Sequence, residues 1–414
     1  MRRWQYQVVL GLLTPWLLWD AWRRHRHARP GQRHLLEQFG RLRGGLPQGG
    51  LWLHAVSLGE VRAAAMLVSA VQARWPDLPI VISTTTETGA EAARGLDLPH
   101  FYAPFDLAFA QRRVLALLRP RLMVVMETEL WPNMVREAGR ADVPLVIANA
   151  RLSDRSYRRY ARWGGGLLRG VLSGVELICA QSVADRDRFL ALGAVHAEDC
   201  GNLKFDLPVS KKDVPVPAER RLTWLAASTH PGEEVQVLAA HQEVLVRYPE
   251  AHLILVPRHP ERADEVRRLV ERSGLSVETW SPGRQPGDRP AVEVVDRAGL
   301  LAGLFPDVPV VFMGGSLVPV GGHNPIEPAA VGRAVLHGPQ VQNFRQVFAA
   351  LGERDACQGV ADSEALGAAV IECFDQPERW AATGARARSV IAEHRGAADR
   401  LVERLAPRLD AMAS

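Results

Sequence analysis

Short apolar runs alternate with longer amphipathic segments along most of this chain, and this alternation limits the possible fold more than any other feature. The runs in the first half lie at 51–56, 79–84, 122–127, 144–148 and 177–180. The segments between them repeat apolar residues with a helical period, as Ala63 to Arg74 does. Strands joined through helices run parallel, and a parallel sheet needs helices on both faces. The first half therefore predicts a doubly wound α/β domain.

A second alternating series follows a charged, proline-rich segment. Its strand-like runs lie at 223–228, 252–256, 292–295, 309–313 and 334–337. A chain of 414 residues suits two domains of roughly 100 to 200 residues each. We predict a membrane-associating segment at 1–30, a Rossmann-like domain at 31–205, a linker at 206–221 and a second Rossmann-like domain with terminal helices at 222–414. The carboxyl ends of the two sheets should face a common ligand cleft.

The first 30 residues predict a helix that associates with a membrane. A mainly apolar stretch from Val8 to Trp19 is edged by tryptophans and followed by several arginines. It is shorter than the roughly 20 apolar residues of a transmembrane helix, and no small-residue cleavage site follows it. These features favour an uncleaved helix in, or shallowly entering, an anionic membrane surface, with the rest of the chain on the cytoplasmic side. A helix packed on the protein is the alternative.

The net charge argues against one class of protein, and the scarcity of lysine draws attention to one residue. The 50 basic and 46 acidic residues leave a net charge of +4, which argues against a dedicated nucleic-acid binder. Only three basic residues are lysines, and two of these, Lys211 and Lys212, lie in the predicted linker. Lys204 closes the first domain in the segment Gly201 to Asp206. We expect it to meet an anionic group, although a solvated lysine is the usual alternative.

Glu60 is the first catalytic candidate. It follows the run at 51–56, where a strand passes through a small loop into a helix. At the carboxyl edge of a parallel strand, Glu60 could act as general base for an acceptor hydroxyl. Ser57 and Glu60 also fit a capping box, in which both side chains only satisfy helix amides. We assign Ser57 and Gly59, beside Glu60, to the acceptor side of the site.

Two further acids, Glu127 and Glu129, follow the apolar run that ends at Met126. Acids directly after a buried strand are poorly placed for a core and well placed for a site. Either could balance charge or hold an acceptor, and ordinary acids at a helix start are the alternative.

Two segments of the second half suit a phosphate-bearing ligand. Arg258 follows a strand and precedes a helix that starts near Pro260, which places it at the sheet edge. A second loop runs from Met313, Gly314 and Gly315 to Asn324, Pro325, Ile326 and Glu327. Glycines allow close approach of the backbone to a ligand, and Glu327 could accept hydrogen bonds from a ribose. A glycine-rich turn with capping residues is the alternative for either loop.

Several known motifs are missing. G-x-G-x-x-G, the Walker lysine loop and H-E-x-x-H do not occur, which weakens assignment to dinucleotide oxidoreductases, P-loop enzymes or zinc proteases. Asp185 and Asp187 match the D-x-D of metal-dependent sugar transferases, but they lie in a predicted helix that starts near Ser182. The four cysteines show no C-x-x-C spacing. The cysteines therefore indicate neither a zinc knuckle nor a redox pair, and no motif of a bound cofactor is found.

A basic helix in the first domain forms a candidate surface for an anionic lipid. Ser153 is a plausible N-cap, and four arginines recur after it at helical spacing, namely Arg155, Arg158, Arg159 and Arg162. A solvated basic face is the alternative.

Seven segments together resemble one family. They are WLHAVSLGE (52–60), METELWPN (126–133), NARLSDRSYRRY (149–160), GNLKFD (201–206), AASTHPGEE (226–234), VPRHPER (256–262) and MGGSLVPVGGHNPIEPA (313–329). In this order they look like the 3-deoxy-D-manno-octulosonate (Kdo) transferases of lipopolysaccharide assembly. The resemblance implies a two-domain GT-B fold at the cytoplasmic face of the Gram-negative inner membrane. It also implies metal-free, inverting transfer of Kdo from CMP-Kdo to a lipid A precursor, lipid IVA.

The resemblance also assigns roles to residues. Glu60 matches the family's catalytic base, and Glu129 or Glu127, with Lys204, matches groups proposed to support the transition state. Pro257, Arg258, Met313 to Gly315 and Asn324 to Glu327 match the CMP-binding segments. Another GT-B transferase or epimerase, and a non-catalytic nucleotide binder at a membrane, are the alternatives. The number of Kdo residues added, the acceptor's acyl pattern and the oligomeric state are left open.

Overall fold

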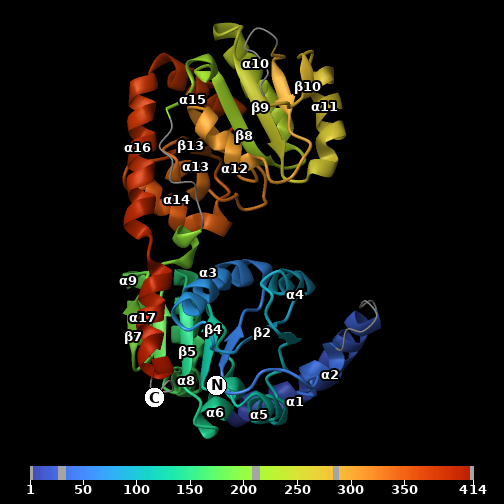
Figure 1. The fold of residues 1–414 in the computed structure, drawn as a ribbon, viewed down its shortest axis with the longest axis vertical. Coiled ribbons are helices and arrows are strands. Elements are labelled where there is room, and N and C mark those ends of the chain that lie inside the picture. Colours follow the sequence, from blue (N-terminus) through green and yellow to red (C-terminus); the bar gives the residue numbers. More distant parts are fainter. Residues whose placement is uncertain (1–2, 27–33, 208–214, 283–288, 411–414) are drawn as a thin grey trace. The chain divides into compact units, whose positions relative to one another are not determined.

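The computed structural model describes residues 3–26, 34–207, 215–282 and 289–410. The chain divides into two compact units, each built around its own sheet (Figure 1). Unit 1 comprises Met1–Asp206 and Arg395–Ser414, and unit 2 comprises Leu207–His394. The division falls at the start of the predicted linker, part of which (208–214) lies outside the described residues. Each unit is described by itself.

Unit 1 contains a parallel sheet of seven strands in the order β3-β2-β1-β4-β5-β6-β7. Its strands are β1 (Leu51–His54), β2 (Ile80–Thr84), β3 (His100–Tyr102), β4 (Leu122–Met126), β5 (Leu145–Ala150), β6 (Leu177–Ala180) and β7 (Ala197–Asp199). Every residue of the five inner strands is buried, as expected for a parallel sheet covered on both faces. The strand order reverses between β1 and β4, so the predicted doubly wound topology is confirmed.

The helices between these strands cover the two faces of the sheet. They are α3 (Leu58–Arg74), α4 (Glu87–Arg94), α5 (Ala108–Leu118), α6 (Pro132–Arg140), α7 (Asp154–Trp163), α8 (Gly165–Leu172) and α9 (Val183–Ala191). A short 3₁₀ helix, η1 (Leu203–Asp206), follows β7. Helices and strands alternate because each strand's apolar residues need a helix on either side of the sheet.

The last helix, α17 (Ala397–Asp410), belongs to unit 1, so its prediction as part of the C-terminal domain was wrong. It packs on α3 and η1, and its Leu401 and Leu405 are buried in the core of unit 1. Asp206 anchors its start by accepting hydrogen bonds from the backbone nitrogens of Gly396 and Ala398, both at 2.6 Å. An amphipathic stripe shows that a helix packs, but not on which sheet.

The N-terminal helix α1 (Arg3–Arg26) belongs to unit 1, and two of its polar side chains form hydrogen bonds with later parts of that unit. The Tyr6 hydroxyl donates to Asp106 Oδ2 at 2.6 Å, and Gln7 Nε2 donates to Asn133 Oδ1 at 2.7 Å. Large apolar side chains on this helix remain exposed, namely those of Trp4, Val8, Val9, Leu12 and Trp19. No helix within the described ranges is long and apolar enough to cross a membrane.

Unit 2 repeats the architecture of unit 1, with strand order β10-β11-β9-β8-β12-β13-β14. The strands are β8 (Thr223–Thr229), β9 (His252–Pro257), β10 (Val277–Thr279), β11 (Val292–Val294), β12 (Val310–Met313), β13 (Ala334–His337) and β14 (Gln358–Gly359). The helices are α10 (Glu233–Arg247), α11 (Ala263–Arg272), α12 (Leu301–Leu304), α13 (Ile326–Ala330), α14 (Arg345–Gly352), α15 (Ser363–Asp375) and α16 (Pro377–His394). The order reverses between β8 and β12, which places a second ligand-binding edge where these strands end.

Candidate active site

The acids predicted from the first half of the sequence gather at the carboxyl edge of the first sheet. Glu60 follows β1, and Glu127 and Glu129 follow β4. These two strands are neighbours at the point where the strand order reverses. Ligands of doubly wound proteins bind at this point. The structure therefore brings the three carboxylates to the edge where an active site is expected.

Glu60 lies in the first turn of α3 and is 7% exposed. Its Oε2 accepts a hydrogen bond from the backbone nitrogen of Val56 at 2.7 Å, and its Oε1 accepts one from the Ser57 hydroxyl at 3.1 Å. Ser57 is the N-cap of α3. The capping interaction that was the alternative to catalysis is thus present, and it fixes the position of the carboxylate.

Capping does not account for the electrostatics of Glu60. Burial raises the pKa of Glu60 to about 8, the Val56 amide opposes this rise, and the carboxylates of Glu127 and Glu129 add to it. A carboxylate with a pKa near the operating pH is suited to general base catalysis. Glu60 therefore combines the fixed position of a cap with the proton affinity of a base.

The two acids after β4 differ in their surroundings. Glu127 has a backbone φ of 57°, in the left-handed region that few residues other than glycine adopt. Glu129 accepts a hydrogen bond from Trp131 Nε1 at 2.7 Å, and burial raises its pKa. Strained backbone and perturbed carboxylates are both common at functional sites.

Lys204 lies in η1 and interacts electrostatically with Glu127, one of these three acids. Its backbone nitrogen donates to Asn202 Oδ1 at 3.0 Å, and the preceding Leu203 nitrogen donates to Asn149 Oδ1 at 3.0 Å. Burial lowers the pKa of Lys204, while Glu127 raises it. The prediction that Lys204 meets an anionic group is consistent with this proximity to Glu127.

The predicted acceptor residues lie in the same unit. Ser57 and Gly59 flank the start of α3, and Gly59 is exposed. The basic helix is α7, and Ser153 caps it by accepting a hydrogen bond from the Ser156 nitrogen. All four of its arginines are exposed, namely Arg155, Arg158, Arg159 and Arg162. Contact of these residues with an acceptor stays a prediction.

The predicted donor-binding residues lie at the carboxyl edge of the second sheet. Pro257 ends β9 and Met313 ends β12. The exposed Arg258 follows β9, and its backbone nitrogen donates to the Thr229 carbonyl at 2.9 Å. Gly315 has a φ of 68°, and a Cβ on it would meet the His323 ring at 3.0 Å. This glycine is therefore packed closely against His323, and an approach of the loop backbone to a ligand stays a prediction.

The segment Asn324 to Glu327 forms a small hydrogen-bonded turn. Asn324 Nδ2 donates to Glu327 Oε1 at 3.0 Å, and Asn324 Oδ1 accepts from the Ile326 nitrogen at 3.0 Å. Pro325 precedes α13 as its N-cap. Burial raises the pKa of Glu327. A fixed carboxylate at this edge fits the predicted contact with a ribose, which stays a prediction.

Glu233 is a candidate site residue that the sequence analysis missed. It is buried, and its carboxylate accepts hydrogen bonds from the nitrogens of Gly315 at 2.7 Å, Ser316 at 3.0 Å and Leu317 at 2.9 Å. It therefore joins the segment after β8 to the loop after β12, at the point where the strand order reverses. Followed by Glu234 at the start of α10, it resembles an ordinary helix-start acid in the sequence.

A histidine pair lies in the same place and was also missed. The Nε2 atoms of His230 and His323 are 2.7 Å apart, and the two rings are stacked with an interplanar angle of 2°. Burial lowers the pKa of His230, and it lowers that of His323 to about 4. Both rings are therefore neutral at pH 7, so one Nε2–H donates to the other Nε2.

The D-x-D match does not form a shared ligand pair. Asp185 is buried and accepts a hydrogen bond from the Leu152 nitrogen, whereas Asp187 is exposed and pairs with Arg186. In the described part of the chain, no three His, Cys, Asp or Glu side chains are grouped so that they could hold a metal ion.

A cavity of about 1350 Å³ lies in unit 2, beside Thr223, Ala251 and Ala291, where β8, β9 and β11 begin. Its described lining contains none of the predicted site residues. Because ligands of this fold bind where strands end, we do not assign the reaction to this cavity.

Known proteins resemble the chain along most of its length. A family model described as 3-deoxy-D-manno-octulosonic-acid transferase (kdotransferase) matches residues 33–207. The chain is 36% identical over 387 residues to the 3-deoxy-D-manno-octulosonic acid transferase of Haemophilus influenzae, with 88% of each chain covered. It is 33% identical over 428 residues to that of Bordetella pertussis, which covers 98% of this chain and 99% of the relative.

A solved structure supports the fold. A glycosyltransferase from Rickettsia africae matches with a TM-score of 0.54 at 13% identity, covering 87% of this chain and 99% of the other. At this identity the likeness concerns the fold alone. Together with the two doubly wound sheets, it confirms the predicted GT-B class.

Proposed function

Because this chain belongs to the 3-deoxy-D-manno-octulosonic-acid transferase family of glycosyltransferases, we propose that it transfers Kdo from CMP-Kdo to a lipid A precursor, lipid IVA. The transfer would belong to lipopolysaccharide biosynthesis and would invert the anomeric centre. The observation that carries the proposal is the buried Glu60 carboxylate, held by Val56 and Ser57 beside Glu127 and Glu129.

In the proposed reaction, Glu60 removes the proton from the acceptor hydroxyl. The acceptor oxygen forms a bond to the anomeric carbon of Kdo as the bond from that carbon to the CMP phosphate oxygen breaks. CMP leaves with the bonding electron pair, and Glu60 retains the proton. A base with a raised pKa favours this step because it binds the proton more strongly than an ordinary carboxylate.

Cationic side chains would offset the negative charge of the donor. CMP-Kdo carries a phosphate and a sugar carboxylate, and the phosphate gains charge as its bond to the sugar breaks. We propose that Arg258 contacts the nucleotide phosphate and that Lys204 stabilises charge near Glu127. The loop whose amides Glu233 holds would form part of the surface that contacts the nucleotide. Under this proposal the reaction needs no bound metal or cofactor.

Unit 1 would bind both the lipid acceptor and the membrane surface. We propose that the exposed apolar side chains of α1, among them Trp4, Leu12 and Trp19, enter the cytoplasmic face of the inner membrane. The exposed arginines of α7 would contact anionic lipid headgroups or phosphates of the acceptor.

One assay tests the proposal. Purified protein is incubated with CMP-Kdo and lipid IVA, with and without excess EDTA, and the products are weighed by mass spectrometry. We expect a mass increase of one or more Kdo residues in both conditions. Transfer only from a UDP-sugar in a parallel donor panel would support a different GT-B enzyme. Loss of transfer in EDTA with recovery in Mg²⁺ would contradict the metal-free reaction.

A further inference from the structure

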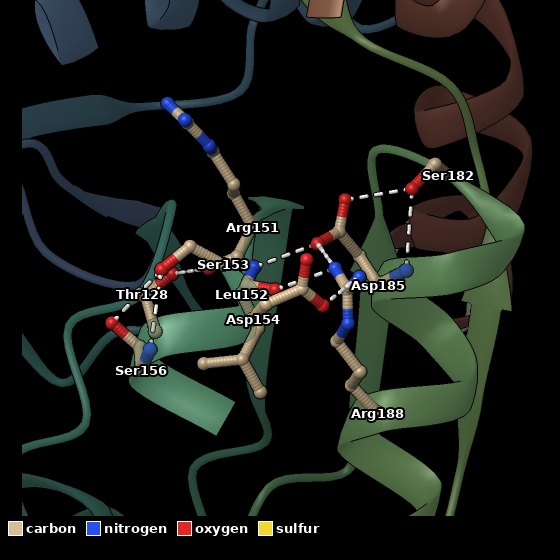
Figure 2. A network of polar contacts seen from close by, with 9 residues as sticks. All are labelled: Thr128, Arg151, Leu152, Ser153, Asp154, Ser156, Ser182, Asp185 and Arg188. Carbon is tan, nitrogen blue, oxygen red and sulfur yellow. Dashed lines mark hydrogen bonds and ion pairs between the residues drawn. The ribbon is translucent and has the colours of Figure 1, made fainter. Parts of the chain in front are cut away.

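The backbone at Arg151 is fixed by side chains from two other segments (Figure 2). Arg151 follows β5, whose neighbours in the sheet are β4 and β6. The Thr128 hydroxyl, from the segment after β4, donates to the Arg151 carbonyl. The next residue, Leu152, donates its backbone nitrogen to Asp185 Oδ1 at 2.8 Å and accepts from Arg188 Nη1 at 2.8 Å. The chain around Arg151 is therefore held on both sides.

The Asp185 carboxylate, which accepts the hydrogen bond from Leu152, is buried at a cost in desolvation free energy. Asp185 is 1% exposed, and it also accepts a hydrogen bond from the Ser182 hydroxyl at 2.7 Å. Arg188 lies 3.4 Å from Asp185 Oδ1 and pairs with Asp154. A buried carboxylate persists only when hydrogen bonds and opposite charge compensate its desolvation. Here that compensation fixes the conformation of the segment after β5.

The Arg151 guanidinium points away from this network (Figure 2). It makes no hydrogen bond or ion pair with any residue that the structure describes, although Arg151 is partly buried. Its positive charge lowers the pKa of Lys204, whereas Glu127 raises it, so the three groups interact electrostatically. A fixed backbone thus presents an unpaired cation close to the proposed catalytic group.

Arg151 also lines a pocket of about 230 Å³ with Glu127, Thr128, Ser153, Ser156 and Tyr160. The pocket is smaller than the roughly 300 Å³ at which sites for drug-sized ligands begin. It suits one substituent of a substrate rather than a whole substrate. The hydroxyls of Ser153 and Ser156, 3.2 Å apart, add hydrogen-bonding groups to its wall.

We propose that Arg151 binds an oxyanion of a substrate and that Thr128 is a positioning residue for it. The inference rests on the proposed function, which supplies two sources of such a group: the carboxylate of Kdo and a phosphate of the lipid acceptor. A guanidinium pairs with either through two parallel hydrogen bonds. In both cases Arg151 determines specificity, because a substrate without the charged group leaves the arginine unpaired.

Kinetics of three variants separate the sources. Arg151→Gln, Arg151→Lys and the control Arg186→Gln, which alters a half-buried arginine of α9, are compared at varied donor and at varied acceptor concentration. We expect Arg151→Gln to lower kcat/KM roughly 10- to 100-fold for one substrate, as loss of a charged hydrogen bond does. The kcat/KM of Arg151→Lys should lie between those of Arg151→Gln and the wild type.

The substrate affected identifies the oxyanion. A fall in kcat/KM confined to the donor, with inhibition by CMP unchanged, assigns the sugar carboxylate. A fall confined to the acceptor, and absent with a dephosphorylated acceptor, assigns the phosphate.

The positioning role of Thr128 has its own test. Thr128→Val should raise the KM of the same substrate as Arg151→Gln does, with kcat less affected. In the double variant the two effects should not add, because Thr128 acts through Arg151. Additive effects would remove Thr128 from the proposal.

A binding measurement keeps the inference independent of turnover. Free Kdo and, separately, inorganic phosphate are titrated into the wild type while the Arg151 Nε–H resonance, assigned with Arg151→Lys, is followed by NMR. Displacement of this resonance by either anion supports the oxyanion site even if the wild type transfers no sugar, in which case only the proposed function fails. An unmoved resonance, together with unchanged kinetics in a folded Arg151→Gln, overturns the inference.

Discussion

The Glu127 carboxylate raises the pKa of Glu60, although 67 positions separate the two residues in the chain. They meet because β1 and β4 are adjacent in the sheet and each residue follows the end of its strand. Glu129 adds to the same effect. The electrostatics of the proposed base are therefore a consequence of strand order.

Glu60 should make unit 1 less stable as the pH rises. Its folded pKa of about 8 lies above the ordinary value of 4.5, so the folded state holds a proton that the unfolded state has lost between these values. Stability should fall as the pH rises through this window. Glu60→Gln keeps an oxygen for the Val56 amide and removes the ionisation. Since one pKa unit corresponds to about 1.4 kcal/mol, the variant should be more stable than the wild type by a few kcal/mol at pH 9.

Thermal unfolding at pH 5 and pH 9 checks this expectation. The gain in stability of Glu60→Gln should shrink toward pH 5. Glu364→Gln, which alters an exposed acid in the first turn of α15, serves as the matched control and should show no such dependence. An equal Tm for Glu60→Gln and wild type at pH 9 would contradict the raised pKa.

Glu233 should be needed for nucleotide binding. Glu233→Ala leaves the nitrogens of Gly315, Ser316 and Leu317 without their acceptor, and unsatisfied buried donors cost about 1 to 3 kcal/mol each before water enters. We expect CMP affinity to fall at least tenfold, measured by calorimetry. Glu271→Gln, an exposed acid of α11, is the control. Wild-type affinity in Glu233→Ala would show that this loop does not hold the nucleotide.

The strands could be predicted from sequence only where they are long enough to show an apolar run. All ten predicted strands are present, and the four that were missed are β3, β7, β10 and β14. These are the edge strands of the two sheets, and each has only two or three residues. Edge strands are short and partly polar because one side faces no neighbour, so the pattern that reveals an inner strand is missing there.

Site residues were predictable where a charged residue directly follows a strand. Glu127 and Arg258 stand out in this way because β4 and β9 end at the residue before them, whereas Glu60 follows β1 after a short loop. Glu233 was missed because it resembles a helix-start acid, and Arg151 was missed because the run predicted before it ends at residue 148, whereas β5 extends to Ala150. Glu233 is recognised by its hydrogen bonds to a loop distant in the chain, and Arg151 by a guanidinium without a partner among the described residues. Both features depend on three-dimensional packing.

The basic face of α7 should bind anionic membranes. Charge reversal at Arg155 and Arg159 should weaken binding to phosphatidylglycerol vesicles and slow transfer to the lipid acceptor, with CMP affinity unchanged. The effect should shrink with added salt, because exposed charges are screened beyond roughly 8 to 10 Å at physiological ionic strength.

The matched control for α7 reverses Arg268 and Arg272, which have the same spacing on α11 and are also exposed. This control changes the net charge equally. Equal loss of vesicle binding in both double variants would show that total charge, and not the α7 face, determines the interaction.

The central claim is that Glu60 is the general base, and the pH dependence of kcat/KM for Kdo transfer by wild type and Glu60→Gln tests it most directly. We expect wild-type kcat/KM to rise with pH and level off near pH 8, where Glu60 has lost its proton. Glu60→Gln should bind CMP normally, turn over roughly 10²- to 10⁴-fold more slowly and lack this rise. A folded Glu60→Gln that transfers Kdo at close to the wild-type rate would contradict the account and leave Glu60 as a helix cap.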